Sequence, residues 1–371
     1  MAVRGSSTGC ASVTRLRALL GVGATLLALL AAGCSGTNPY YDPAKRHHTP
    51  QGFTNNYGPP GGKPLSELIR WTYERQRDGL PSVPSKHVDG YQFPLDKPDL
   101  AWLGANRTQP SITWIGHATL LVQLAGLNIL TDPHFSERAF PVQWMGPRRR
   151  VPLPASLDEL PRIDAVVISH SHYDHLDLQT VRALSKQAGG PPRFFVPLGI
   201  ERWLADQGIH GAQAMDWWDK TTLGNLELTF VPAQHWSART PFDRNRTLWG
   251  GWVLKAGTSS FYFAGDTGYS RDFVDIGERF GGFDVAAIPV GAYLPRWFMK
   301  DQHVDPDEAV QIHKDVRSRL SIGIHWGSFE LTDEPLDAPI GDLDDARRRM
   351  GVSADEFRLL RPGQTIRMTG P

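Results

Sequence analysis

Cysteine is nearly absent from this sequence of 371 residues, because Cys10 and Cys34 are its two copies and both lie near the N-terminus. The rest of the chain therefore has neither a disulfide framework nor a thiolate metal site. An excess of charge of one sign is also lacking, since 39 Lys and Arg residues balance 39 Asp and Glu residues. This balance gives no reason to expect nucleic acid or a strongly anionic surface as a partner.

After Cys34 the sequence also lacks a Gly-x-Ser-x-Gly motif, so a serine or cysteine nucleophile of the usual kind is not indicated. With 40% hydrophobic and 21% charged residues, the composition is that of a globular protein, and the length is sufficient for a large core. The chemistry has to come from other residue types.

A mostly apolar run without charged residues occupies residues 19–32, and two arginines precede it. The length of this run and its charged flank are typical of a signal peptide. The run is too short for a transmembrane helix. It ends in Leu30-Ala31-Ala32-Gly33-Cys34, which is similar to a bacterial lipoprotein cleavage box, and ordinary secretory cleavage near Ala32 is the alternative. We therefore predict a signal peptide over 1–34 and a lipid-anchored protein of the bacterial cell envelope that faces the periplasm or the exterior.

Residues 35–94 are predicted to be a tether and irregular lead-in, because Gly, Pro and Asn are frequent and a helical pattern occurs only over 65–77. His47 and His48 are expected to be solvated there. Residues 95–371 are predicted to form one domain. Its predicted strands cover residues 112–115, 120–124, 127–131, 165–168, 193–196, 226–231, 248–255, 260–264, 285–289, 320–325 and 357–360. Its predicted helices cover 178–187, 271–280, 306–317 and 343–350.

The strand at 165–168 is followed by His170, His172, Asp174 and His175. The first two histidines are two residues apart, so on an extended backbone their side chains point to the same side. Four nitrogen and oxygen donors at one strand end are the ligand types that suit zinc and, less selectively, iron or manganese.

Three further strand ends carry the same chemistry. His235 follows the strand at 226–231, Asp266 follows the strand at 260–264, and His325 ends the strand at 320–325. Because α/β sheets place their sites at the carboxyl ends of strands, we expect these side chains to meet the first cluster.

The motif His170-x-His172-x-Asp174-His175 after an apolar strand resembles the signature of the metallo-β-lactamase superfamily. This resemblance implies an α/β fold, the four-layer αβ/βα sandwich, and two metal ions, Zn²⁺ in the first instance. It assigns His170, His172 and His235 to the first metal. It assigns Asp174, His175 and His325 to the second metal, with Asp266 bridging both. Two such ions would acidify a water molecule and stabilise both the attacking and the leaving oxygen.

A narrower resemblance is to N-acyl-phosphatidylethanolamine-hydrolysing phospholipase D, over about residues 95–363. The stretches that carry it are 114–119, 173–177, 216–218, 232–236, 263–269, 295–300, 302–306 and 324–327. It implies a catalytic domain over 95–371 that acts as a dizinc phosphodiesterase on a phospholipid at a membrane surface. The products would be N-acylethanolamine and phosphatidic acid. The leader is the part of the chain that departs from the pattern.

The catalytic residues expected from this resemblance are Asp174, Asp266 and His303. We expect His303 to hydrogen-bond the phosphate or to protonate the leaving oxygen; capping its neighbours is the structural alternative. His117 is expected to orient a metal ligand, with a plain turn residue as the structural alternative, and His134 could be either structural or functional. The aromatic residues of 217–218 and 294–299 fit either core packing or a membrane interface. Arg148–Arg150 and Arg296 fit either solvated charge or contact with anionic headgroups.

Other functions stay open at this stage. A metal-dependent hydrolase of a soluble small ester, lactone or phosphodiester has the same ligand set. A di-iron redox protein of the same superfamily is disfavoured, because a carboxylate usually replaces His172 there. A cell-envelope scaffold with a vestigial site is disfavoured by the complete ligand set.

Overall fold

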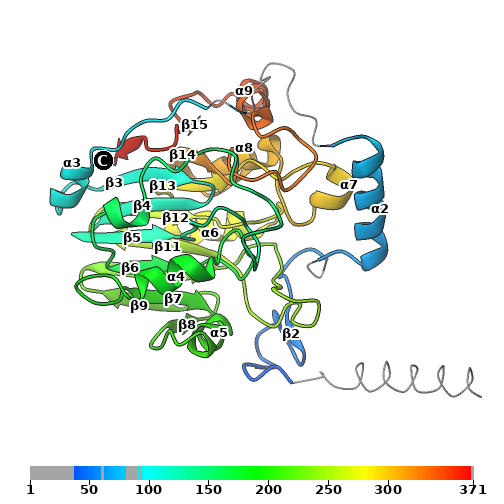
Figure 1. Cartoon of the computed structure of the whole chain (residues 1–371), viewed down its shortest axis with the longest axis horizontal. Helices are drawn as coiled ribbons and strands as arrows, with labels where there is room; N and C mark the ends of the chain where they lie inside the picture. The colour runs from blue at the N-terminus through cyan, green and yellow to red at the C-terminus, as the bar shows by residue number, and fades with distance from the viewer. Residues whose placement is uncertain (1–36, 60–61, 81–90, 92, 369–371) are drawn as a thin grey trace, which may run out of the picture.

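The computed structural model describes residues 37–59, 62–80, 91 and 93–368 (Figure 1). The predicted leader and both cysteines lie outside the described residues, so the structure does not bear on them. Within the described part of the chain, no helix is both long and apolar enough to cross a membrane.

Two seven-stranded sheets form the centre of the molecule. The first contains, in spatial order, β16 (Thr365–Arg367), β3 (Ser111–Gly116), β4 (Thr119–Leu124), β5 (Leu127–Thr131), β6 (Ala165–Val167), β7 (Arg193–Pro197) and β8 (Gln213–Met215). The second contains β15 (Phe357–Leu359), β14 (Ser318–Ile324), β13 (Phe283–Pro289), β12 (Ser259–Phe263), β11 (Gly251–Ala256), β10 (Leu226–Val231) and β9 (Lys220–Leu223).

Both sheets are mixed in the same way. Pairs from β16 to β5 are antiparallel and pairs from β5 to β8 are parallel. In the second sheet, pairs from β9 to β12 are antiparallel and pairs from β12 to β15 are parallel. Parallel neighbours need a crossover, and helices lie in five of these connections. They are α4 (Leu178–Leu184), α5 (Ile200–Asp206), α6 (Asp272–Phe280), α8 (Pro306–Asp315) and α9 (Ala338–Met350).

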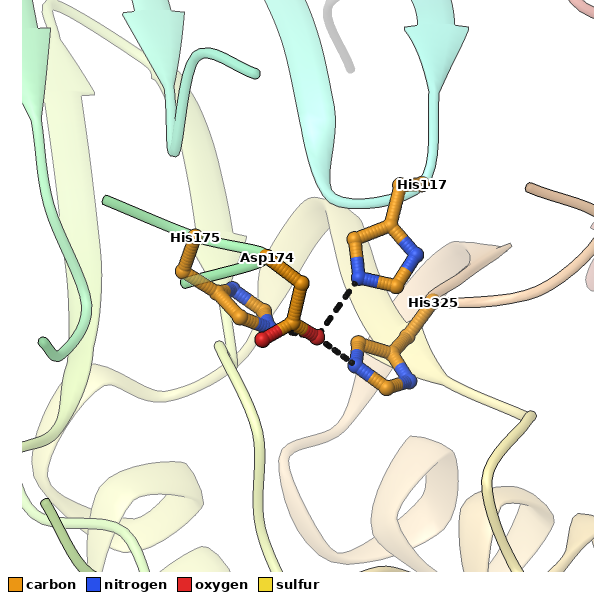
Figure 2. A group of neighbouring side chains, drawn as sticks. All are labelled: His117, Asp174, His175 and His325. Carbon is orange, nitrogen blue, oxygen red and sulfur yellow. Dashed lines mark hydrogen bonds and ion pairs between the residues drawn. The ribbon is translucent and has the colours of Figure 1, made fainter. Parts of the chain in front are cut away.

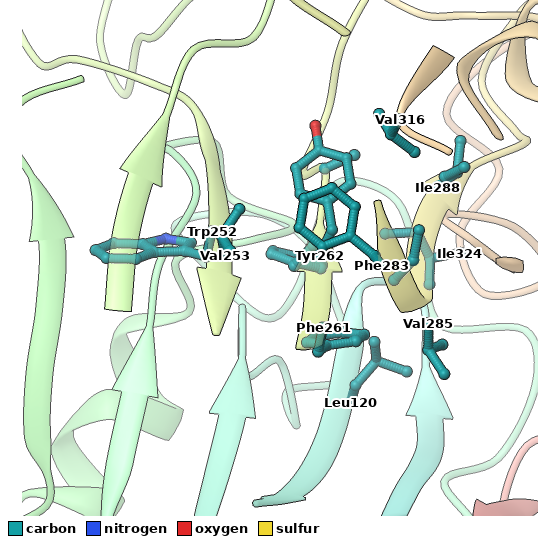
Figure 3. Packing of buried hydrophobic residues seen from close by; sticks show 14 of the residues in the cluster. Leu120, Trp252, Val253, Phe261, Tyr262, Phe283, Val285, Ile288, Val316 and Ile324 are labelled. Atoms are coloured by element: carbon teal, nitrogen blue, oxygen red, sulfur yellow. The ribbon is translucent and has the colours of Figure 1, made fainter. Parts of the chain in front are cut away.

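Alternating side chains of the strands build separate apolar layers. Leu120 of the first sheet points towards Phe261 and Val285 of the second, in the core between the sheets (Figure 3). Leu121, next to Leu120, and Val166 of β6 belong to a second cluster, which packs the first sheet against α4 and α5. Two sheets with helices on their outer faces are the four-layer sandwich predicted from the sequence.

Some elements differ from the predictions. The strand predicted at 248–255 begins only at Gly251, and the helix predicted at 343–350 begins earlier, at Ala338. The sequence did not reveal β8, β9, β16, α5 or α3 (Leu100–Ala105), because three to seven residues are too few for a period to stand out. The remaining elements are the predicted helix α2 (Leu65–Arg77) and the short elements β1 (His48–Thr49), β2 (Gly52–Phe53), α7 (Arg296–Met299) and a 3₁₀ turn at Leu157–Glu159.

The expectation that His47 and His48 are solvated is wrong. Both side chains are buried, and their Nε2 atoms lie 2.7 and 2.9 Å from the two carboxylate oxygens of Asp216. Lys45 donates to the same carboxylate, and Trp217 stacks on His47. A buried carboxylate needs hydrogen-bond donors, and Lys45, His47 and His48 supply them. Residues 37–59, named here the N-terminal segment, are thereby attached to the domain.

Burial alone would raise the pKa of Asp216, but the hydrogen bonds from His47 and Lys45 outweigh burial and hold that pKa below its ordinary value. A lowered pKa in the folded state stabilises the fold above the unfolded-state pKa of about 3.9, and this stabilisation is lost on acidification. Asp216→Asn should therefore be less stable than the wild type above about pH 5, and the difference should shrink below about pH 4. Urea unfolding of both proteins across this range measures it. A difference that grows on acidification would contradict this assignment.

Candidate metal centre

Four strand ends deliver polar side chains to one place between the sheets. His170 lies just beyond β6, His235 beyond β10, Asp266 beyond β12, and His325 directly after β14. All four are buried. Strands that end at one rim of the sandwich place these side chains together, as the sequence predicted.

His170, His172 and His235 form a first group, whose ring nitrogens converge. The Nδ1 atom of His172 lies 2.8 Å from His170 Nε2 and 3.2 Å from His235 Nε2. His235 Nδ1–H donates to the carbonyl of Gln302, which leaves a lone pair on His235 Nε2. Ser169 Oγ donates to Asp132 and accepts from His170 Nδ1, so His170 Nε2 also carries a lone pair. One proton on His172 cannot satisfy both lone pairs, whereas a cation can.

A second group surrounds the carboxylate of Asp174, as Figure 2 shows. Its Oδ2 atom lies 3.0 Å from His117 Nε2, 3.2 Å from His325 Nε2 and 3.4 Å from His175 Nε2. His117 comes from the turn between β3 and β4, and its contact with Asp174 is compatible with the predicted role of orienting a metal ligand.

Asp266 lies between the two groups. Its Oδ2 atom is 3.1 Å from the Nε2 atoms of both His175 and His325. The same oxygen is 3.9 Å from the Nε2 atoms of both His170 and His235. One carboxylate in contact with both groups has the position of a bridging ligand.

These side chains fit a binuclear metal site. His175 Nδ1–H donates to Asp132, and its Nε2 atom faces the oxygens of Asp174 and Asp266. Burial disfavours a charged His175, but these carboxylates outweigh burial and hold its pKa well above the ordinary value, so the place that Nε2 occupies favours positive charge. His175 Nε2 and Asp266 Oδ1 are buried and have no hydrogen-bond partner among the described residues. Buried polar atoms without partners are destabilising. Cations between these atoms would satisfy them.

The electrostatics of the two groups differ. Burial lowers the pKa of His172 to about 4 and of His235 to about 3, so both imidazoles are neutral, the form that binds metal. Burial also disfavours the charged form of His325, but Asp266 and Asp174 outweigh burial and raise its pKa to about 9. The carboxylates thus make the second group a place that stabilises positive charge.

Sequence reasoning missed Asp132 as a functional residue. Its Oδ2 atom lies 2.7 Å from His175 Nδ1, and its other oxygen accepts from the backbone N–H of Ser169. It therefore fixes the orientation of one ligand and the backbone next to another. The available indication was its place after an apolar strand, directly before Pro133.

His303 lies beside the centre, with its Nδ1 atom 3.9 Å from Asp266 Oδ2. It precedes α8, where Asp305 caps the helix and Pro306 is the first residue, as predicted. Arg296 donates to the carbonyl of His303 and pairs with Glu308, so it has an internal role in place of the solvated charge or headgroup contact between which the sequence left it. Burial lowers the pKa of His303 to about 3, so its neutral imidazole presents one N–H as a donor.

Other predicted candidates lie elsewhere. His134 is buried and contacts the guanidinium of Arg149 and the ring of Phe329. Arg148 and Arg150 pair with glutamates. Trp217 is buried on His47, so core packing is the outcome for that residue.

A pocket of about 530 Å³ opens onto the centre. His172, Asp174, Asp266 and His303 line its polar base. Its walls are mainly apolar and aromatic, with two cationic side chains. These wall residues include Leu68, Trp71, Phe140, Trp236, Phe298, Met299, Lys63 and Arg244.

Comparison with known proteins agrees with the geometry. The profile of the beta-lactamase superfamily domain matches residues 127–326, which include every predicted metal ligand. The chain belongs to the metallo-β-lactamase superfamily. Of the solved structures in this superfamily fold, isothiocyanate hydrolase from Delia radicum gut bacteria covers 69% of this chain and 98% of its own, with a TM-score of 0.55 and 21% identity.

Relatives within the superfamily include "N-acyl-phosphatidylethanolamine-hydrolyzing phospholipase D 1" of Caenorhabditis elegans. It is 39% identical over 77% of this chain and 82% of its own length. An uncharacterised protein of Mycobacterium tuberculosis is also 39% identical, over 75% of this chain and 74% of its own. The protein is thus a metal-dependent hydrolase of this superfamily.

Asp266→Asn removes the charge of the bridging carboxylate while keeping its shape. Replacing residues that merely support metal ligands lowers metal affinity or activity by about 10–100-fold. Loss of the bridging charge should therefore lower the hydrolytic activity by at least about 100-fold. Bound metal per chain should also fall, as measured by elemental analysis after dialysis. Asp345→Asn, at an exposed position of α9, is the control and should keep its metal. Wild-type metal content in Asp266→Asn would contradict the bridging role.

Proposed function

We propose that this protein is a phosphodiesterase of the phospholipase D type that hydrolyses N-acyl-phosphatidylethanolamine. The observation that carries the proposal is the pocket, whose polar base contains the predicted metal ligands and whose walls are largely apolar. A phospholipid has the matching division, with a charged phosphodiester and long acyl chains. The similarity to a relative with this name supports the proposal.

The reaction adds water across one phosphorus–oxygen bond. The water oxygen bonds to phosphorus, and the bond to the N-acylethanolamine oxygen breaks. One proton of the water goes to the leaving oxygen, which gives N-acylethanolamine and phosphatidic acid. Two divalent ions, which the His-rich donor set suggests are zinc, would acidify the water and neutralise the phosphoryl oxygens when bound.

Residues around the base would bind and orient the phosphodiester. The N–H of His303 can donate to a phosphoryl oxygen, and its lowered pKa makes this a better role than that of a proton donor at neutral pH. Lys63 and Arg244 add positive charge to the wall. They are held by an ion pair from Lys63 to Asp301 and by the donation of Arg244 to the carbonyl of Lys63.

The surface near the pocket fits a lipid surface as the partner. Helix α2 buries none of its residues, although Leu68 and Trp71 of this helix line the pocket. Large exposed apolar side chains occur on α2, on α7 and on loops next to other wall residues: Leu65, Ile69, Tyr73, Trp144, Phe242 and Trp297. Such side chains insert favourably at a membrane interface. A lipid anchor on Cys34 at the cell envelope would keep the pocket at that interface.

The test is release of N-acylethanolamine by the zinc-loaded full chain from N-acyl-phosphatidylethanolamine in mixed micelles. Wild type should release it, and His172→Ala should be slower by at least about 100-fold, because a ligand is lost. His210→Ala is the matched control, since His210 is exposed and outside the centre. No release by wild-type protein with its metal bound would contradict the lipid substrate. Turnover of soluble phosphodiesters or lactones under the same conditions would then favour the alternative hydrolase.

A further inference from the structure

The N-terminal segment reaches the metal centre from outside the region that matches the superfamily profile. After its attachment to Asp216 it passes through β1 and β2, and the backbone N–H of Phe53 donates to the carbonyl of Asn245. It then continues to Asn55, whose side chain is buried. The segment is therefore packed against the loop that follows β10, which carries a predicted metal ligand.

Asn55 contacts that ligand directly. Its Oδ1 atom accepts from the backbone N–H of His235 at 3.1 Å and from Trp249 Nε1–H at 3.0 Å. Its Nδ2 atom donates to the carbonyl of Pro59, which fixes which way the amide points. One amide oxygen thus satisfies two buried donors, one of which belongs to a residue of the centre.

The position of His235 depends on contacts at both ends of the residue. Asn55 holds its backbone, and the carbonyl of Gln302 holds its Nδ1–H at 2.9 Å. These two contacts leave Nε2 directed at the ring of His172 and at Asp266. Loss of either contact would free a ligand whose placement within tenths of an ångström decides metal affinity.

Close packing shows that the segment has little freedom at this place. A Cβ atom on Gly58, which has a φ of +139°, would lie 2.2 Å from the side-chain oxygen of Gln234, the residue before His235. A Cβ atom on Gly52 would lie 2.1 Å from the carbonyl of Asn245. Glycine at both positions permits the approach that brings Asn55 to His235.

We infer that Asn55 is a positioning residue for the metal ligand His235, and that the N-terminal segment is an integral part of the metal centre. The inference rests on the binuclear centre of the proposed function, but not on the lipid substrate. It also replaces the prediction of a tether over this part of the chain by a structural role.

Zinc affinity of the full chain, measured by competition with a chelating dye, tests the inference. Asn55→Ala removes the acceptor of the His235 N–H and should weaken zinc binding about 10-fold or more. Asn55→Asp keeps an oxygen acceptor and should restore most of that affinity. Asn56→Ala is the matched control, because Asn56 contacts Asp272 of α6 and no metal ligand, and it should bind zinc as the wild type does.

Folded Asn55→Ala with wild-type zinc affinity would overturn the inference, and so would an equal loss in Asn56→Ala. A wild type that binds no zinc would instead contradict the proposed function.

Hydrogen exchange of the wild-type protein gives a second test if Asn55→Ala does not fold. Coupling between two sites is reciprocal, so removal of zinc by a chelator should lower the protection of His235 and of residues 52–57. The amides of β13, an inner strand of the second sheet, are the internal reference. Unchanged protection of His235 and residues 52–57 after zinc removal would overturn the inference.

Discussion

A buried carboxylate among imidazoles is the constraint on which this structure depends. Asp266 is 3% exposed, and one of its oxygens lies within 3.9 Å of nitrogens from five histidines. A charge buried in this way is strongly unfavourable unless cations or donors surround it. The sandwich supplies them by ending four strands at one rim, and the large core between the sheets holds those ends in place.

Backbone conformation shows the same constraint. His117, Asp132 and His325 all have positive φ values, of 54°, 34° and 61°. Such values are uncommon outside glycine and persist only where the surroundings impose them. Here they turn the chain sharply at strand ends, so that the side chains face the centre. The cost in backbone energy is offset by the contacts these residues make with ligands and with one another.

The fold class and the seven proposed ligands could be predicted from the sequence, because strand ends and donor residues leave local patterns. The role of Asp132 was not predicted, since an Asp–Pro pair after a strand is also common in turns. His47 and His48 were misjudged because their partner, Asp216, lies 168 or more residues further along the chain. The role of Asn55 was not predicted for the same reason, because its partner His235 is 180 residues away in the sequence. Long-range hydrogen bonds between irregular segments have no period and no spacing from which to be read.

The pocket joins this centre to the outside, with metal ligands at its base and apolar walls towards the surface. The central claim is that the two groups of ligands each hold an ion and share Asp266. Anomalous diffraction at the zinc absorption edge, from crystals of the zinc-loaded protein, tests it most directly. The account predicts two peaks about 3.5–4 Å apart, on either side of Asp266. A single peak there, or zinc bound instead among His47, His48 and Asp216, would contradict it.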